Sequence, residues 1–578
     1  MNKSKDRAPL IISKERFDGL WGLFSRHPFI ITAVICVYLT GFGYQNNMLL
    51  KYFTEFTAAA VIGFCLYRCI RRLLDRRRSK ALAVGIFTLE CAVSIVMVKL
   101  YLESDNRAEL VYVLGAGAVC LLALLCIGDF IHYGKGYLRR LAVMTISLWG
   151  FVVRLGYVLE TPIVRRQNDV HQFGGPDGHS AYIEYIAENL SFPDVDPTTV
   201  WQFYHPPLHH SICAVWLRLL KLIDIPYDVA CESLQAVSLF CSLSCIILFY
   251  KLLRFFRLKG LSLSVPFAIV VFHPSLVILS GSINNDIMSV TFILASVYMT
   301  ARWYKEPCFK NIIKLAFCIG LGMMTKLSAG LVAPAVAVVF LIVLIENRSQ
   351  FKSLMLQFLT FGGVCAPLGL WWGIRNLIRF GTPLTYVPSL PITSGQYIGD
   401  IPTRTRLFDF SLYQFSDVFE QWTVKTYQEF NPTVAFLKNS LFGEHMRALT
   451  FEGFLIVYPK TLFWVAMVLA VISFISLVAV QFSRGNRPVK LMLLILEATL
   501  LTSYYKFCFE YPFICTMNFR YIVPCLFIGA AAIGLVMKKL DAKGNAVCCI
   551  SQVAVTLLSA VMCVMSFLTY FVLISSLS

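Results

Sequence analysis

Long apolar runs recur along most of this sequence and limit what it can fold into. A helix needs about 17–25 apolar residues to cross the hydrocarbon core of a bilayer. With 57% hydrophobic and only 15% charged residues, the composition is that of a membrane protein. About fifteen runs approach the required length, which predicts an all-α polytopic membrane protein. The runs lie near residues 28–44, 52–70, 81–101, 110–131, 141–158, 229–250, 262–282, 287–303, 311–325, 328–346, 353–373, 454–480, 489–507, 521–537 and 547–573.

Basic residues gather in short loops between these runs, for example at 68–80, 251–259 and 302–310. This bias is typical of cytoplasmic loops, so the net charge of +18 indicates orientation in a membrane and not binding to nucleic acid. A further run at 208–223 would invert the bias if it crossed, and we expect it to form an interfacial or re-entrant helix. The sequence thus predicts a multi-pass membrane protein with a cytoplasmic N-terminus, and we expect it in a bacterial plasma membrane.

The polar segment 160–210 interrupts this apolar pattern and contains five of the nine histidines. Asp169 follows a predicted span, where a tuned carboxylate could act as a general base for an acceptor hydroxyl. It could equally be a solvated residue, or one paired with a neighbouring arginine. Asp177 precedes a predicted short helix and could cap it or pair with His179; the same two residues could serve as metal ligands or as a proton relay.

A second histidine-rich element, H-P-P-L-H-H, begins at His205 and opens the predicted interfacial helix. Its prolines suit a first helical turn. Histidines such as His205 and His209 could donate to phosphate oxygens there, or could simply lie at the interface as amphipathic side chains.

Isolated charges also occur at the predicted external ends of spans. Lys326, Arg375 and Arg520 are candidates to hold the phosphate of a lipid-linked donor, because charges at membrane ends are often functional. Asp286, after Asn285, could bind sugar hydroxyls or a divalent cation, although capping the next helix is the simpler role. All of these residues fall on the predicted extracytoplasmic face.

The same pattern divides the chain into four parts. Residues 1–135 form a four-helix unit of unknown role, and 136–373 form the membrane core with a first external loop at 159–228. Residues 374–453 are rich in aromatic side chains and predict a small folded external cap, since disordered segments lack such residues. Residues 454–578 hold the C-terminal spans. A disulfide between Cys508 and Cys515 is conceivable in an external loop.

Several short motifs, taken in order, resemble the GT-C superfamily of membrane glycosyltransferases. They are H-P-P-L at 205–208, N-D at 285–286, T-K at 325–326, R-N-L-I-R-F-G-T-P-L at 375–384 and M-N-F-R-Y-I-V-P at 517–524. The resemblance spans about residues 139–540 and is closest to the protein O-mannosyltransferase and aminoarabinose-transferase branch. It implies a helical bundle with an extracytoplasmic active site. There, a sugar would be transferred from a polyprenyl-phosphate donor with inversion of its anomeric configuration.

The resemblance also implies residue roles. Asp169 matches the catalytic acid of the first external loop, but the D-E-x-x-Y pattern of the family is replaced here by D-G-H-S-A-Y, so Asp177 remains a rival base. His179 and Tyr182, with Asn285 and Asp286, are expected near the acceptor or sugar. The acceptor is expected to be a glycan, a lipid or a protein, and a divalent metal remains an open question.

Two other functions compete with this interpretation. A polysaccharide polymerase or O-antigen-ligase-like enzyme would use a diphosphate-linked donor. A transporter of lipid-linked saccharides would require ionisable residues within the spans, where Glu90 is the main example. The loop acid and the H-P-P-L element favour the glycosyltransferase.

Overall fold

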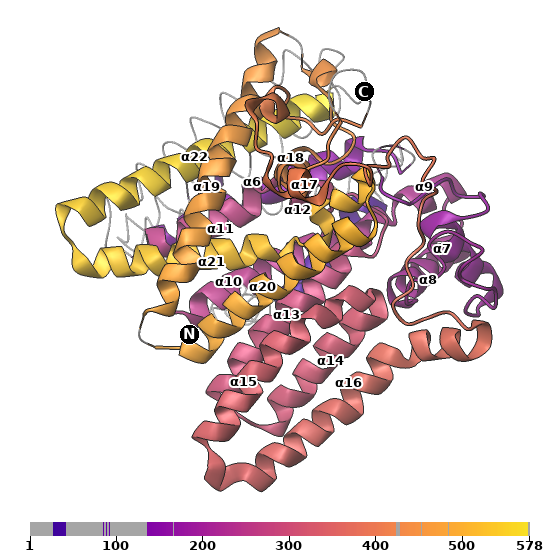
Figure 1. The fold of residues 1–578 in the computed structure, drawn as a ribbon, viewed down its shortest axis with the longest axis horizontal. Helices are drawn as coiled ribbons and strands as arrows, with labels where there is room; N and C mark the ends of the chain where they lie inside the picture. The colour runs from indigo at the N-terminus through magenta and orange to yellow at the C-terminus, as the bar shows by residue number, and fades with distance from the viewer. Residues whose placement is uncertain are drawn as a thin grey trace, which may run out of the picture.

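A computed structural model describes residues 27–41 and 136–575, apart from 164, 166, 423–427, 452 and 484, together with four single positions between 85 and 92. In these ranges the chain is helical and contains no named strand, which confirms the predicted all-α class (Figure 1). The α-helices are α2 (Pro28–Gly41), α6 (Gly136–Glu160), α7 (Gly178–Asn189), α8 (Leu208–Leu222), α9 (Tyr227–Glu232), α10 (Gln235–Phe255), α11 (Leu261–Phe272), α12 (Pro274–Ile278), α13 (Asp286–Lys305), α14 (Phe309–Thr325), α15 (Ala333–Glu346), α16 (Phe351–Phe380), α17 (Thr403–Phe408), α18 (Pro432–Phe442), α19 (Val457–Gln481), α20 (Arg487–Glu510), α21 (Pro524–Lys543) and α22 (Ala546–Ser575).

Seven helical stretches of the described part are long and apolar enough to cross a bilayer. They fall on predicted runs and confirm a polytopic membrane protein; the count of about fifteen spans stays a prediction. Most of the predicted 1–135 unit, including the runs at 52–70, 81–101 and 110–131, lies outside the described residues. The seven stretches are Ala142–Leu159, Tyr227–Phe255, Leu327–Glu346, Arg348–Phe380, Gly453–Gln481, Arg487–Glu510 and Ala546–Tyr570.

One predicted run, 262–282, differs in the structure. It is divided into α11 and α12, with the extended residue His273 between them. Pro274 follows the break, and it cannot donate the backbone hydrogen bond that would continue a helix. The chain therefore reaches the loop before α13 through a short separate helix.

The segment between α6 and α10 forms a lobe beside the bundle, built around α7 and α8 (Figure 1). At about 1.5 Å per residue, the 15-residue α8 is about 22 Å long and too short to span a core of about 30 Å. Its inner face packs against α7, while Ile212, Val215, Leu219 and Leu222 are exposed. An exposed apolar face on a short helix fits the predicted interfacial position.

The cap predicted at 374–453 is folded where the structure describes it, although α16 continues past its expected start to Phe380. Its longest helix, α18, packs on α12, and Ser275 donates from Oγ to the Ser440 carbonyl at 2.6 Å. Lys438 and Glu429 form an ion pair that is fully buried. The cap is thus tied to the membrane helices beneath it.

The proposed disulfide between Cys508 and Cys515 is wrong. Both residues are free thiols, and Cys508 Sγ instead lies 3.5 Å from the carbonyl oxygen of Thr516 as its hydrogen-bond donor. Closeness in the sequence is no guide here, because Cys508 sits inside α20 and Cys515 in the turn that follows it.

Candidate active site

Four charged side chains from distant parts of the sequence meet at the end of the bundle below the cap. Arg520 donates from Nη2 to Asp169 Oδ2 at 2.8 Å, and its Nη1 lies 3.6 Å from Asp286 Oδ2. Lys326 Nζ donates to Asp286 Oδ1. The side chains of Asp286 and Arg520 are only 2% and 10% exposed, whereas Asp169 is 28% exposed. We call Asp169, Asp286, Lys326 and Arg520 the charged cluster.

Asp286 and Lys326 are brought together by the connections between α13 and α14. Asp286 is the first residue of α13, and its backbone N–H donates to Asn284 Oδ1 at 3.1 Å. Asn285 donates from Nδ2 to the carbonyl of Thr325 at 3.0 Å, which fixes the end of α14 beside the start of α13. The backbone amide is therefore capped by Asn284, and the Asp286 carboxylate stays available to the two cations.

Arg520 lies in a 3-10 turn, Phe519–Tyr521, that the preceding asparagine holds in place. Asn518 Oδ1 accepts the Arg520 backbone N–H at 2.9 Å, and its amide nitrogen donates to Glu444 of the cap. Arg520 Nη2 also donates to the Tyr521 hydroxyl at 3.0 Å, while Lys326 Nζ lies 5.1 Å from the centre of the Tyr521 ring. Tyr521 thus contacts both cations.

Asp169 is positioned by a loop that adopts an unusual backbone conformation. Its φ is +61°, a left-handed value that aspartate and asparagine tolerate better than most residues. Its carbonyl accepts the N–H of His179 in the first turn of α7 at 3.1 Å. Two residues earlier, Gln167 donates to Gly281 O at 2.7 Å and accepts from Ile283 N at 3.0 Å, so the loop is fastened beside α13.

The opposite charges control ionisation in the cluster. Burial alone raises the pKa of Asp169, but the charge and hydrogen bond of Arg520, with the charge of Lys326, outweigh it, so the pKa is lowered. Burial lowers the pKa of Arg520, but Tyr521 and the two aspartates shift it well above its ordinary value. The pKa of Glu444 is raised by its burial, which Arg520 offsets in part.

Asp177, the rival base, lies outside this cluster. Its Oδ1 is 2.6 Å from Nδ1 of His171, and the two side chains are 39% and 46% exposed. Asp177 occupies the N-cap position of α7 without a side-chain capping bond, and His179, its expected partner, faces other histidines instead. The pairing of Asp177 with His179 is therefore wrong. Gly178 with φ +91° makes the turn between them, where a Cβ would lie 2.5 Å from a carbonyl oxygen.

The remaining predicted histidines form a second, neutral group. His179 Nδ1 is 2.8 Å from His210 Nε2, and His179 stacks on His205 with ring centres 5.5 Å apart. Tyr182 stacks on His210 at 4.1 Å and donates its hydroxyl to the His205 carbonyl. His209 lies beside them, 1% exposed, with Nε2 at 3.6 Å from Cys213 Sγ. We call His179, His205, His209 and His210 the histidine cluster.

Burial lowers the pKa of every member of the histidine cluster, because it removes the charged rings from water and none of the four forms an ion pair with a carboxylate of the described residues. For His209 the pKa falls to about 4, with a small opposing contribution from Asp286. For the other three it falls well below 6.5, and neighbouring histidines lower it further. The cluster is therefore uncharged near neutral pH.

Arg375 makes its contacts away from the charged cluster. It donates from Nη2 to the Pro193 carbonyl at 2.6 Å and stacks over the Trp372 ring at 4.6 Å. With Arg379 it faces Asp194 of the first external loop, at 3.5 Å and 2.8 Å respectively. These contacts join the end of α16 to that loop.

Sequence patterns identified the charged residues but missed the polar groups that position them, namely Gln167, Asn284, Asn518, Glu444 and Tyr521. Asn518 stands inside the M-N-F-R-Y-I-V-P motif and Asn284 directly precedes the N-D motif, so a signal for them existed. Glu444 carries no such signal, because its role depends on how the cap folds over the bundle.

The sequence left open whether the protein requires a metal ion. In the charged cluster, the contacts of the two carboxylates bear on this question. Both aspartates bind the guanidinium of Arg520. In the ranges that the structure describes, no group of three or more histidine, cysteine or acidic side chains is arranged to hold a metal ion. Metal dependence stays a prediction.

Comparison with known proteins finds one family model that matches part of the chain, from the start of α8 into α16. Residues 205–372 match the family model described as dolichyl-phosphate-mannose-protein mannosyltransferase. This region includes the H-P-P-L element, Asp286 and Lys326. The match confirms the predicted resemblance to the protein O-mannosyltransferase branch. No curated protein matches the chain.

Among solved structures, the chain is similar to the oligosaccharyltransferase of Archaeoglobus fulgidus. The apo form is 15% identical, with a TM-score of 0.41, over 75% of this chain and 56% of that one. The form tethered to an acceptor peptide is also 15% identical, with a TM-score of 0.40, over 77% and 56% of the two chains. The chain thus spans little more than half the length of that enzyme.

Proposed function

We propose that this protein transfers a sugar from a polyprenyl-phosphate donor to an acceptor hydroxyl, with inversion, on the extracytoplasmic face of the membrane. The observation that carries the proposal is the Asp169–Arg520 pair, set beside Lys326 and Asp286 at a membrane end of the helix bundle. It combines a carboxylate that can accept a proton with cations that can stabilise a leaving phosphate.

The charge balance of the cluster gives a reason for its arrangement. Two aspartates and two cations are neutral together, so each carboxylate is compensated before a donor binds. A donor phosphate adds a negative charge, and Arg520 and Lys326 are the groups able to meet it. As Arg520 turns toward the phosphate, the pKa of Asp169 rises, because Arg520 is its main stabilising charge. Donor binding would thus make Asp169 a better base.

The transfer step follows directly. The acceptor oxygen attacks the anomeric carbon from the side opposite the phosphate, and its proton passes to Asp169. The bond between the anomeric carbon and the phosphate oxygen breaks, and the electron pair leaves on the polyprenyl phosphate. Arg520 and Lys326 stabilise the growing negative charge on that oxygen. The anomeric configuration is inverted in a single displacement.

The other predicted residues take supporting roles in this proposal. Asn285 positions Lys326 through the Thr325 carbonyl, and Asp286 orients both cations. His179, His205 and Tyr182 are almost fully buried, which favours a role in shaping the acceptor side of the loop over direct contact with phosphate. Arg375 holds the loop against α16 through Pro193 and Asp194.

The similarity to dolichyl-phosphate-mannose-protein mannosyltransferases supports a monophosphate-linked sugar donor and a hydroxyl acceptor on a protein. A diphosphate-linked oligosaccharide would instead support the polymerase or ligase alternative. These two donors differ in mass and in the product they leave, polyprenyl phosphate or polyprenyl diphosphate.

The decisive experiment is mass spectrometry of the lipids that copurify with the full chain, followed by a transfer assay with the sugar-lipid found. We expect a monophosphoryl polyprenyl sugar, and release of polyprenyl phosphate when an acceptor is supplied. Copurification and turnover of a diphosphoryl oligosaccharide would overturn the donor assignment. Lipid uptake without any glycosidic product would overturn the enzyme assignment in favour of a transporter.

A further inference from the structure

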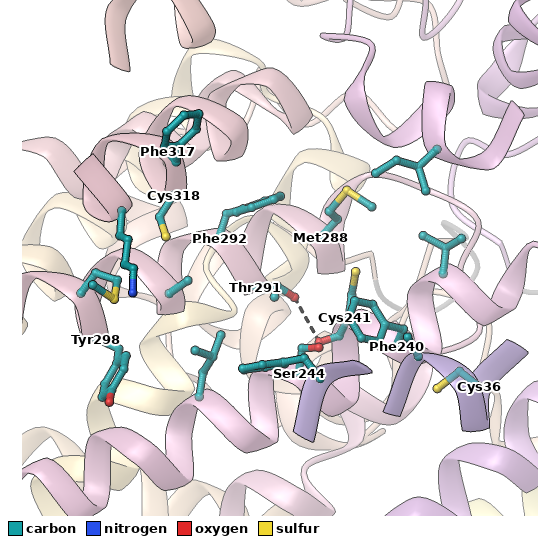
Figure 2. Close-up of a pocket in the computed structure, with 18 of the residues that line it drawn as sticks. Cys36, Phe240, Cys241, Ser244, Met288, Thr291, Phe292, Tyr298, Phe317 and Cys318 are labelled. Atoms are coloured by element: carbon teal, nitrogen blue, oxygen red, sulfur yellow. Dashed lines mark hydrogen bonds between the residues drawn. The ribbon is translucent and has the colours of Figure 1, made fainter. Parts of the chain in front are cut away.

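A large cavity lies apart from the charged cluster, between α2, α8, α10, α13 and α14. It has a volume of about 940 Å³. Figure 2 shows its lining, with Cys36, Phe240 and Cys241 toward one end and Phe317, Cys318 and Tyr298 toward the other. None of the four charged-cluster residues lines it.

The cavity runs along α13 and the neighbouring helix α10. On α13 the lining residues recur every three or four positions, so they share one face. They extend from Met288 to Arg302, about 21 Å at 1.5 Å per residue. The groove is therefore long enough to hold an acyl chain that extends through one leaflet, about 15 Å of hydrocarbon. The α13 residues are Met288, Thr291, Phe292, Ala295, Tyr298, Met299 and Arg302.

Three cations mark the end of the cavity that is far from the charged cluster. Lys251, Arg302 and Lys314 come from the adjoining ends of α10, α13 and α14. Since α13 begins at Asp286, Arg302 lies at its opposite end. Among the residues that the structure describes, no carboxylate forms an ion pair with any of these three cations. Lys251 Nζ lies over the Phe29 ring, 4.6 Å from its centre.

An apolar channel that ends in several unpaired cations has the complementary shape of an anionic lipid. Basic pockets between membrane helices on the cytoplasmic side are a recurrent type of phospholipid headgroup site. The basic loops place this end on the predicted cytoplasmic side. A zwitterionic lipid would bring its own cation into the basic group, so a net negative headgroup fits better.

We propose that this cavity binds an anionic phospholipid of the cytoplasmic leaflet. Its phosphate lies among Lys251, Arg302 and Lys314, and one acyl chain lies along the groove between α10 and α13. The outward apolar residues of α8, such as Val215 and Leu219, cover the far end of the chain. Because this headgroup lies at the end of α13 opposite Asp286, the site is distinct from that of the sugar donor.

The test measures lipid retention by the purified full chain, so it does not depend on transferase activity. The protein is reconstituted in nanodiscs of phosphatidylcholine with a small fraction of phosphatidylglycerol, extracted in mild detergent, and its bound lipid is quantified. We expect phosphatidylglycerol to be strongly enriched over its fraction in the disc. Equal retention of the two lipids would overturn the proposal.

Variants locate the site. Lys251→Gln/Arg302→Gln/Lys314→Gln should weaken phosphatidylglycerol retention by about 100-fold, since each nearby cation contributes about a factor of five. Lys259→Gln/Lys305→Gln/Lys310→Gln removes the same charge from the same side but outside the cavity, and should retain the lipid. Ala295→Trp keeps all charges and narrows the groove, and it should also lower retention.

Three outcomes would contradict the proposal. An equal loss in the control variant would indicate a general surface attraction. Displacement of phosphatidylglycerol by equimolar polyprenyl phosphate would identify the cavity as a carrier-lipid site. Retention that neither the charge-removing triple variant nor Ala295→Trp changes would place the lipid elsewhere, with the cavity filled by the chain itself.

Discussion

The first external loop contributes Asp169 to the charged cluster and all four members of the histidine cluster, but burial affects the ionisation of the two clusters in opposite ways. Asp169 stays ionised because Arg520 lies 2.8 Å away and Lys326 is near. In the part of the chain that the structure describes, the four histidines form no ion pair with a carboxylate, and burial lowers the pKa of each. Burial of a charge is costly unless an opposite charge compensates it, and here the difference is whether the helix ends supply one.

This contrast suggests different roles for Asp169 and for the histidine cluster. Asp169 stays ionised at the place where charge would change in the proposed transfer step. The histidine cluster is buried and uncharged near neutral pH, and Tyr182 stacks on His210. Its role is therefore in packing. Variants that act on only one of the two clusters can separate their roles.

The largest expected effect is that of replacing Asp169, the proposed base. Asp169→Asn keeps the shape of the side chain but removes its proton affinity, and transfer should fall by about 10²–10⁴-fold. Asp177→Asn, eight positions away and paired with the exposed His171, is the matched control and should stay within a few-fold of the parent. The measurement is sugar transfer from the purified donor. If Asp177→Asn abolishes transfer and Asp169→Asn does not, the base is Asp177.

Arg520→Lys should have the next largest effect, about 10²–10³-fold on transfer. Lysine keeps the charge but not the planar fork that reaches both aspartates through Nη1 and Nη2. Arg379→Lys is the control, because Arg379 is half exposed and contacts only Asp194 among the described carboxylates. Equal losses in the two variants would show that the Arg520 fork has no special role.

The histidine cluster should make the stability of the fold depend on pH. The folded pKa of His209 is about 4, against 6.5 for the ordinary group, so the unfolded chain binds more protons between these values. Stability is therefore full above pH 6.5 and falls as the pH drops toward 4. For His209 alone the loss is at most about 3 kcal/mol.

Thermal unfolding between pH 7 and pH 4.5 checks this expectation. His209→Gln should flatten the decline, whereas His171→Gln, at an exposed position, should leave it unchanged. The pKa of Asp169 is lowered, so its pairing contributes its pH dependence below about 4 and outside this window. A melting temperature that is constant from pH 7 to pH 4.5 would show that the histidines are not buried as neutral groups.

The sequence predicted the helical membrane class, which depends on local patterns of apolar residues; the interfacial position of α8 stays a prediction. It also singled out Asp169, Asp286, Lys326 and Arg520, since charges are rare at helix ends in such a chain. It could not pair them, because Asp169 and Arg520 are 351 positions apart and meet only through packing of the bundle. The Asp177–His179 pairing failed for a local reason, the turn at Gly178 with φ +91°.

The smallest expected effect concerns the support of Asp169. Gln167 makes two hydrogen bonds, to Gly281 O and from Ile283 N, that hold the loop beside α13. Gln167→Leu removes both, and transfer should fall about tenfold, because a shift of about 1 Å in a catalytic group costs up to 10²-fold. Asn189→Leu also removes an amide from the first loop, but one that bonds only Tyr185 O within its own helix.

Gln167→Leu separates positioning from proton transfer because it leaves the Asp169 carboxylate in place. The shape of the pH–rate profile should therefore be kept while the maximal rate falls, whereas Asp169→Asn should remove the limb that reports the base. The control Asn189→Leu should retain both rate and profile. A Gln167→Leu enzyme with full activity would mean that Arg520 alone fixes Asp169, and that the contrast between the two clusters rests on charge and not on the loop.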